Sequence, residues 1–259
     1  MSTPNISLTL YYHPECPFVH RVLTTLRELS LPYNTVFVDL DVPRSADYLA
    51  INPRGTVPAL KFSSPDFRNG KETILTESLV IIYFLGNLFP NHLLPAAPSA
   101  GVVTAVARTS IFFFINAWEN KITPLFDKVY MASFGGEKEA KEVEDMVVGA
   151  IEKEIDPLLR RQDEDGGGAF LGGREKFTMA EVVAAPVILR LFAFCDGGLL
   201  PRSFKANLLA LPNFGKWASE LVRNESLLKG WDEAGFVSGS RAKLQEFKEG
   251  KFKPKICTQ

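Results

Sequence analysis

The sequence predicts an α/β domain at the N-terminus followed by an all-α domain. Segments typical of strands and of helices alternate over residues 1–88, whereas residues 102–259 show only the hydrophobic periodicity of helices. A stretch rich in proline, residues 89–101, separates the two patterns and is the predicted linker. The length of 259 residues agrees with this division, because one small core rarely organises so long a chain.

The composition argues against several classes of function. The chain is 46% hydrophobic and 23% charged, and its net charge of −1 gives no bulk attraction to nucleic acid or to an anionic membrane. Its three cysteines are far apart and match neither a disulfide framework nor a zinc site, so we expect no metal. Residues 102–118 are apolar, but Arg108 interrupts them and they are too short for a membrane span. Because the N-terminus has no apolar signal segment, we expect a cytoplasmic protein.

The first strand, residues 8–12, is predicted to run into a helix that begins at Cys16 or Pro17. Proline is favoured at the first position of a helix, and the apolar residues that follow have one-faced helical spacing. A thiol at a helix N-terminus has its pKa lowered from about 8.5 into the range of roughly 3.5–7.5. The alternative is that Cys16 is a small buried apolar residue. Its place between a strand and Pro17 favours a reactive thiolate.

The rest of the first domain is predicted to complete a small mixed sheet. Residues 33–40 form a second strand, which gives a βαβ unit with a parallel pair. Residues 43–51 form a short helix that ends in a turn. Residues 60–62 and 73–76 form a hairpin that closes the sheet.

Two further turns of this domain are candidate ligand sites. Pro58 removes a donor at the start of a strand, so the N–H and C=O of Val57 can pair with an extended, peptide-like ligand. Ser78 is the predicted N-cap of the next helix, whose start can bind a carboxylate while Glu77 takes an ammonium group. The alternative is that Ser78 only caps the helix and Glu77 only interacts with its dipole.

Three motifs, Cys16-Pro17-Phe18, Val57-Pro58 and Glu77-Ser78, occur in this order on a βαβ–ββα frame. Together they resemble the thioredoxin-like domain of cytosolic glutathione transferases. The string Cys-Pro-Phe-Val-His-Arg at residues 16–21 is most similar to the omega class. The resemblance covers the whole chain and implies the glutathione transferase fold and a homodimer.

The resemblance implies that Cys16 is the catalytic thiol and forms a mixed disulfide with glutathione. It implies that Val57 pairs its backbone with the cysteinyl unit of glutathione, with Pro58 in the cis form. Val19 occupies the place where dithiol glutaredoxins have a second cysteine. A second glutathione must therefore resolve the mixed disulfide.

Four other residues are implied to contact glutathione. Phe18 would pack beside the tripeptide, and Arg44 falls where omega-class proteins have a lysine. Glu77 and Ser78 would hold the ammonium and carboxylate groups of the γ-glutamyl unit. These groups complement the charges of glutathione one by one.

The second domain is predicted to contain helices at residues 102–118, 122–134 and 138–161, followed by a polar loop at 162–168. A capping box formed by Thr178 and Glu181 opens a helix through Cys195 that is apolar nearly all round, so Cys195 is expected in the core. Shorter helical segments follow, at residues 204–209, 212–222 and 225–231. A charged, solvated tail occupies residues 241–248, and Cys257 is incidental.

The pocket for a second substrate is expected between the two domains, facing Cys16. Aromatic residues are the candidates for its wall, with core packing as the alternative for each of them. The candidates are Phe112, Trp118, Tyr130, Trp231 and Phe236.

The function predicted from these features is glutathione-dependent thiol transfer. Its substrates would be glutathione mixed disulfides, dehydroascorbate or a glutathionyl adduct. A first alternative is conjugation of glutathione to a small electrophile, or isomerisation of one, in a metabolic pathway; Ser or Tyr is the more usual catalytic residue there. A second alternative is a non-catalytic, omega-like binding protein. Intracellular chloride channel proteins also resemble this fold, but their membrane role would require an apolar N-terminal segment, which Arg21, Arg27 and Glu28 interrupt.

Overall fold

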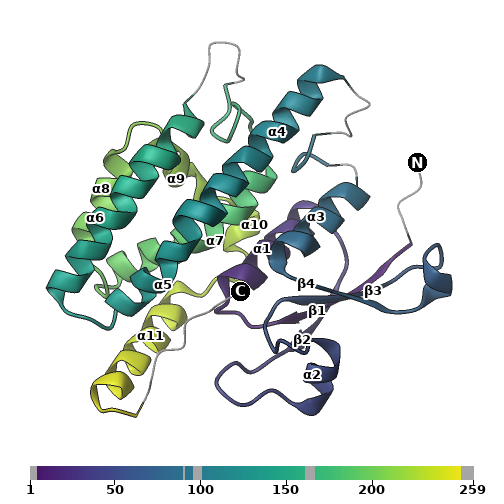
Figure 1. Cartoon of the computed structure of the whole chain (residues 1–259), viewed down its shortest axis with the longest axis horizontal. Helices are drawn as coiled ribbons and strands as arrows, with labels where there is room; N and C mark the ends of the chain where they lie inside the picture. The colour runs from purple at the N-terminus through teal and green to yellow at the C-terminus, as the bar shows by residue number, and fades with distance from the viewer. Residues whose placement is uncertain (1–4, 90, 96–100, 161–166, 252–259) are drawn as a thin grey trace. The chain divides into compact units, whose positions relative to one another are not determined.

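A computed structural model describes residues 5–89, 91–95, 101–160 and 167–251 (Figure 1). Contacts divide the chain into two compact units, the first within residues 1–96 and the second within residues 97–258. Strands and helices alternate in the first unit, and the second is built from helices. This arrangement confirms the predicted fold class.

The first unit contains a four-stranded mixed sheet in the order β2-β1-β3-β4. Strand β1 pairs in parallel with β2 and antiparallel with β3, and β3 pairs antiparallel with β4. The bounds are Ser7–Tyr12 for β1, Asn34–Phe37 for β2, Ala59–Ser63 for β3 and Thr73–Thr76 for β4. Strand β2 is shorter than predicted, and all four of its residues are exposed at the edge of the sheet.

The register of the sheet decides which turns meet. Ala59, the first residue of β3, pairs with Tyr11 near the end of β1 and with Thr76 at the end of β4. The turn after β1, the turn before β3 and the turn after β4 therefore lie at the same end of the strands. These turns carry the three sequence motifs.

Three α-helices complete the first unit. They are α1 (Pro17–Glu28), α2 (Ala46–Ile51) and α3 (Ser78–Leu88), with a 3₁₀ turn at Arg68–Gly70. Helices α1 and α3 contact each other, and Figure 1 shows them on one side of the sheet with α2 on the other. Apolar residues of α1 and α3 and of β1 and β3 form the core, among them Leu10, Val22, Leu26, Leu60, Ile81 and Leu85.

Two helix starts in this unit differ from the prediction. Helix α2 begins at Ala46 rather than residue 43, because the hydroxyl of Ser45 accepts the N–H of Tyr48 and caps the helix there. The prediction of Ser78 as an N-cap was wrong by one residue. Glu77 is the N-cap of α3, with φ 69° and ψ 120°, and Ser78 is the first helical residue.

The second unit begins with a nearly continuous helical run. Helix α4 (Val102–Ala117) passes through a π-helical turn, Trp118–Ile122, into α5 (Thr123–Ala132). Helix α6 (Glu137–Glu154) ends before a 3₁₀ turn at Asp156–Leu159, so the predicted helix to residue 161 is too long. Pro157 explains the difference, because it lacks the N–H that a continuing α-helix needs.

Helix α7 (Met179–Asp196) is the buried centre of the second unit. Every residue from Met179 to Cys195 is buried, and α7 contacts α4, α8, α9 and α11. The predicted capping box is confirmed: the hydroxyl of Thr178 accepts the N–H of Ala180, and the carboxylate of Glu181 accepts the N–H of Thr178 at 2.7 Å.

The remaining helices are α8 (Arg202–Ala210), α9 (Phe214–Leu221), α10 (Glu225–Leu228) and α11 (Glu233–Lys248). The predicted tail at residues 241–248 is the second half of α11, which has no buried residue. Most of the loop predicted at 162–168 and Cys257 lie outside the described residues. Within the described part of the chain, no helix is both long enough and apolar enough to span a membrane.

Candidate active site

The Cys16 thiol lies at the N-terminus of α1. Cys16 is the N-cap residue, with φ −75° and ψ 120°, and Pro17 is the first helical residue, as predicted. The N–H of Cys16 donates to the carbonyl of His13 at 3.2 Å and closes the turn after β1. Cys16 is 6% exposed, and the first turn of α1 contains no acidic residue. A negative charge on the sulfur would therefore face the N–H groups of the helix start without a carboxylate on that turn.

The turn before β3 lies against this thiol. The Cys16 Sγ donates a hydrogen bond to the Val57 carbonyl at 3.7 Å, and the Val57–Pro58 peptide bond is cis. Val57 is buried, yet its N–H has no hydrogen-bond partner among the residues that the structure describes. A buried backbone N–H without a partner is uncommon, so this one is a candidate donor to a ligand.

The carbonyl of Thr56 in the same turn accepts two hydrogen bonds. The phenol of Tyr48 donates to it at 2.5 Å, and the side-chain amide of Asn52 donates to it at 2.7 Å. Tyr48 and Asn52 are 6% and 1% exposed. Burial, the largest contribution, raises the pKa of the Tyr48 phenol above its ordinary value, so the phenol stays a donor at neutral pH.

Glu77 and Ser78 form the third turn of the site. Glu77 has φ 69°, a conformation that is rare outside glycine, and its carboxylate forms an ion pair with Arg54. Ser78 is 3% exposed, and its hydroxyl accepts a hydrogen bond from the guanidinium of Arg21 at 3.4 Å. Arg21 is fully buried. A positive side chain therefore lies directly beneath the start of α3.

The other two predicted glutathione contacts belong to the same unit. The ring of Phe18 lies 4.9 Å from the guanidinium carbon of Arg21. Arg44 donates four hydrogen bonds to backbone carbonyls, those of Asp39, Leu40, Val42 and Gly55. Its guanidinium therefore joins the loop after β2 to the turn before β3, and little of it remains for a ligand.

The predicted aromatic wall residues lie in the second unit. Phe112 is 38% exposed, whereas Trp118 is fully buried and stacks with Phe114 and Phe126. Tyr130 packs edge-on against Phe134, with ring centroids 5.0 Å apart. The guanidinium carbon of Arg190 lies over two of these rings, 4.8 Å from the centre of the Trp231 ring and 5.6 Å from the centre of the Phe236 ring.

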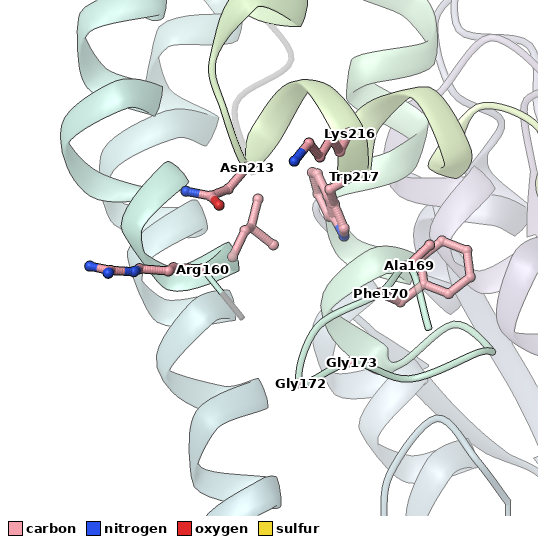
Figure 2. A pocket seen from close by; sticks show the side chains of 9 residues that line it. Arg160, Ala169, Phe170, Gly172, Gly173, Asn213, Lys216 and Trp217 are labelled. Carbon is pink, nitrogen blue, oxygen red and sulfur yellow. The ribbon is translucent and has the colours of Figure 1, made fainter. Parts of the chain in front are cut away.

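A separate pocket of about 280 Å³ lies in the second unit (Figure 2). None of the aromatic candidates lines it. Its walls come from the 3₁₀ turn after α6, the loop before α7 and the start of α9, and are formed by Leu159, Arg160, Ala169, Phe170, Gly172, Gly173, Asn213, Lys216 and Trp217. Across the described ranges, no group of three or more His, Cys, Asp or Glu residues is arranged to hold a metal ion.

Sequence reasoning missed four side chains that hold these turns. Arg21 and Arg54 contact Ser78 and Glu77, and Tyr48 and Asn52 contact the Thr56 carbonyl. The Asn52-Pro53 dipeptide predicted a turn, but the partners of these side chains depend on tertiary contacts that spacing does not reveal. The register of the sheet brings the three motifs themselves together at one end of its strands.

Comparison with known proteins relates the chain to glutathione S-transferases. The family profile "Glutathione S-transferase, N-terminal domain" matches residues 15–88. The glutathione S-transferase-like protein tpcF of Aspergillus fumigatus is 24% identical over 88% of this chain and 96% of its own.

Two solved structures from Trametes versicolor share the fold over nearly the whole chain. Glutathione transferase Omega 1C is 25% identical, with a TM-score of 0.74 over 93% of this chain and 97% of its own. Glutathione transferase Omega 2C is 27% identical, with a TM-score of 0.73 over 92% of this chain and 99% of its own. Residues 15–88 therefore match the N-terminal domain of glutathione S-transferases, and the chain as a whole has the glutathione transferase fold and resembles members of the omega class.

Proposed function

We propose that this protein is a glutathione-dependent thiol transferase in which Cys16 is the nucleophile. The observation that carries the proposal is the place of the Cys16 thiol, at the N-cap of α1 and 3.7 Å from the Val57 carbonyl. A helix N-terminus stabilises a thiolate, and the thiolate is the reactive form of cysteine. The likeness to omega-class structures supports the same chemistry.

The proposed reaction has two exchange steps. In the first, the Cys16 thiolate attacks the glutathionyl sulfur of a mixed disulfide, and the other sulfur leaves as a thiolate that takes a proton from water. In the second, the thiolate of another glutathione attacks the same glutathionyl sulfur, which forms glutathione disulfide and returns the Cys16 thiolate. Both steps conserve electrons, because one disulfide bond forms as one breaks.

An external thiol is needed for the second step because the protein offers no partner for Cys16 close in sequence. Val19 occupies the position three residues along α1, and Cys195 is a buried residue of the second unit. The described residues contain two cysteines, Cys16 and Cys195, and both are free thiols. None of the described residues is therefore a cysteine that could resolve the mixed disulfide internally.

Glutathione would bind across the three turns at the sheet edge. Val57 would donate its unpartnered N–H to the cysteinyl unit of the tripeptide, and its carbonyl would accept an N–H. The start of α3, with Ser78 above the buried Arg21, would hold the γ-glutamyl carboxylate. Glu77 would take the ammonium group in exchange for Arg54. Phe18 and Pro58 complete the proposed contacts, and Arg44 would contribute mainly by holding the loop after β2 against the turn before β3.

The test is glutathione-dependent reduction of a small glutathione mixed disulfide by the wild-type protein, Cys16→Ser and Cys195→Ser. We expect Cys16→Ser to lose at least roughly a hundredfold in kcat/KM, since it lacks the nucleophile. Cys195→Ser is the matched control and should keep the wild-type rate. An inactive wild type would overturn thiol transfer. A Cys16→Ser variant that loses nothing and gains conjugation toward an aromatic electrophile would also overturn it and would favour the conjugation alternative.

We also propose that the protein is a homodimer that associates through α4. This helix exposes a row of large apolar side chains, Val102, Val103, Val106 and Phe113. Exposed apolar groups in this number favour burial against a partner surface. Sedimentation velocity at micromolar concentration should give about twice the mass of 28.7 kDa, and Val106→Glu should shift the population toward one chain. A wild-type protein that sediments as a single chain would contradict this.

A further inference from the structure

We propose that Tyr48 and Asn52 are a positioning pair for glutathione: by donating two hydrogen bonds to the Thr56 carbonyl, they aim the Val57 N–H at the tripeptide. The inference rests on the proposed function and deepens it. It assigns to two buried side chains the control of how well the backbone of Val57 binds glutathione.

The two donors are well placed to hold the carbonyl. Tyr48 lies in α2 and Asn52 is its C-cap residue, whose N–H donates to the Tyr48 carbonyl at 2.8 Å. The side-chain amide of Asn52 also reaches the Thr56 hydroxyl at 3.3 Å, and its oxygen accepts the N–H of Arg54 at 3.2 Å. The pair is therefore fixed to its own helix and to the turn that it holds.

Peptide geometry transmits this hold to Val57. The Thr56 C=O and the Val57 N–H belong to one planar peptide group, and the cis bond of this turn is the next one along the chain. In a trans peptide the N–H points away from the C=O. A carbonyl fixed toward α2 therefore fixes the Val57 N–H away from α2, and this N–H has no internal partner in the described structure.

The two hydrogen bonds also polarise the peptide group between Thr56 and Val57, in addition to orienting it. A carbonyl that accepts two hydrogen bonds in a partly buried setting draws electron density from its peptide, which makes the N–H of the same peptide a stronger donor. The Val57 N–H that glutathione would use is thus oriented before a ligand arrives, and such preorganisation lowers the cost of binding.

The effect can be observed directly at the Val57 amide. The chain contains two Thr-Val pairs, Thr35-Val36 and Thr56-Val57. Labelling threonine carbonyls with ¹³C and valine amides with ¹⁵N therefore gives two selected NMR signals, of which Thr35-Val36 in β2 is an internal control. We expect Tyr48→Phe to move the Val57 signal and leave the Val36 signal in place. Tyr11→Phe is the matched control variant, because the Tyr11 ring packs 5.6 Å from that of Tyr48 but its hydroxyl forms no hydrogen bond within the described residues.

The second measurement is calorimetric titration with S-methylglutathione, a probe that cannot form a disulfide. We expect Tyr48→Phe to weaken its binding roughly five- to tenfold, as for the loss of one buried hydrogen bond, and Tyr11→Phe to keep the wild-type affinity. An analogue with the cysteinyl carbonyl reduced to methylene lacks the acceptor for the Val57 N–H. The wild type and Tyr48→Phe should bind this analogue equally.

The outcomes distinguish a failure of the proposed positioning pair from a failure of the proposed glutathione site. A wild type that does not bind S-methylglutathione overturns the proposed glutathione site. A wild type that binds, with Tyr48→Phe binding equally well, overturns the positioning pair alone. Equal weakening of both ligands by Tyr48→Phe also overturns it, because the loss would then not pass through the Val57 N–H. If Tyr48→Phe fails to fold, Asn52→Asp, which keeps the oxygen that accepts the Arg54 N–H, takes its place in each measurement.

Discussion

Cys16 and Cys195 are both nearly buried thiols, yet they lie at opposite ends of their helices. Cys16 precedes the first turn of α1, whereas Cys195 lies in the last turn of α7 beside Asp196. Helix N-termini favour negative charge and helix C-termini disfavour it. Burial, the largest contribution, raises the pKa of the Cys195 thiol to about 12. The comparison teaches that two thiols of similar exposure can lie in opposite helix-end fields, and that burial keeps the Cys195 thiol protonated in the core.

The strongest test of this contrast is selective alkylation. At pH 8, iodoacetamide should modify Cys16 at least about a thousandfold faster than Cys195, because a thiol with a pKa of about 12 is roughly 10⁻⁴ ionised at that pH. Mass spectrometry of the separate tryptic peptides measures both rates in one sample. Equal alkylation rates of Cys16 and Cys195 in the folded protein would contradict the proposed difference between the two thiols.

A smaller effect is expected on stability at high pH. The folded-state pKa of Cys195 is raised above its ordinary value of 9.0, so the unfolded chain loses this proton first as the pH rises. The contribution of Cys195 to the free energy of unfolding is therefore fully present below pH 9. It declines by about 1 kcal/mol for each pH unit as the pH rises toward 12.

Chemical denaturation at a series of pH values measures this slope. Cys195→Ala should flatten it, and Cys16→Ala is the matched control that should retain it. A slope that survives in Cys195→Ala would show that another group is responsible, and the contrast between the two thiols would then rest on alkylation alone.

Local chemistry explains why much of the fold was predictable. Pro17 after Cys16 marked the start of α1, and the Thr178–Glu181 box marked the start of α7, because each signal acts within one helical turn. The paired strands followed from their composition and from the turns between them. In each case the residues that determine the structure lie close together in the sequence.

The structure differs from the prediction where contacts between residues far apart in the sequence determine the local conformation. The positive φ of Glu77 moved the start of α3 away from the predicted cap, and no residue-type signal indicates such a conformation for glutamate. Arg44 matched a basic position of the resembling family, but its acceptors are backbone carbonyls of the loop after β2 and of the turn before β3. The charged pattern of residues 241–248 concealed a helix whose residues are all outside the core.

The register of β3 has a consequence for how the chain can vary. Its first residue, Ala59, is fixed between Tyr11 and Thr76, whereas its other end leads into the exposed connection at residues 65–72. That connection is at the far end of the hairpin from Cys16 and the turns around it. A fluorophore or an affinity tag inserted at its tip should leave their juxtaposition unchanged, so the molecule provides its own attachment point for reporters.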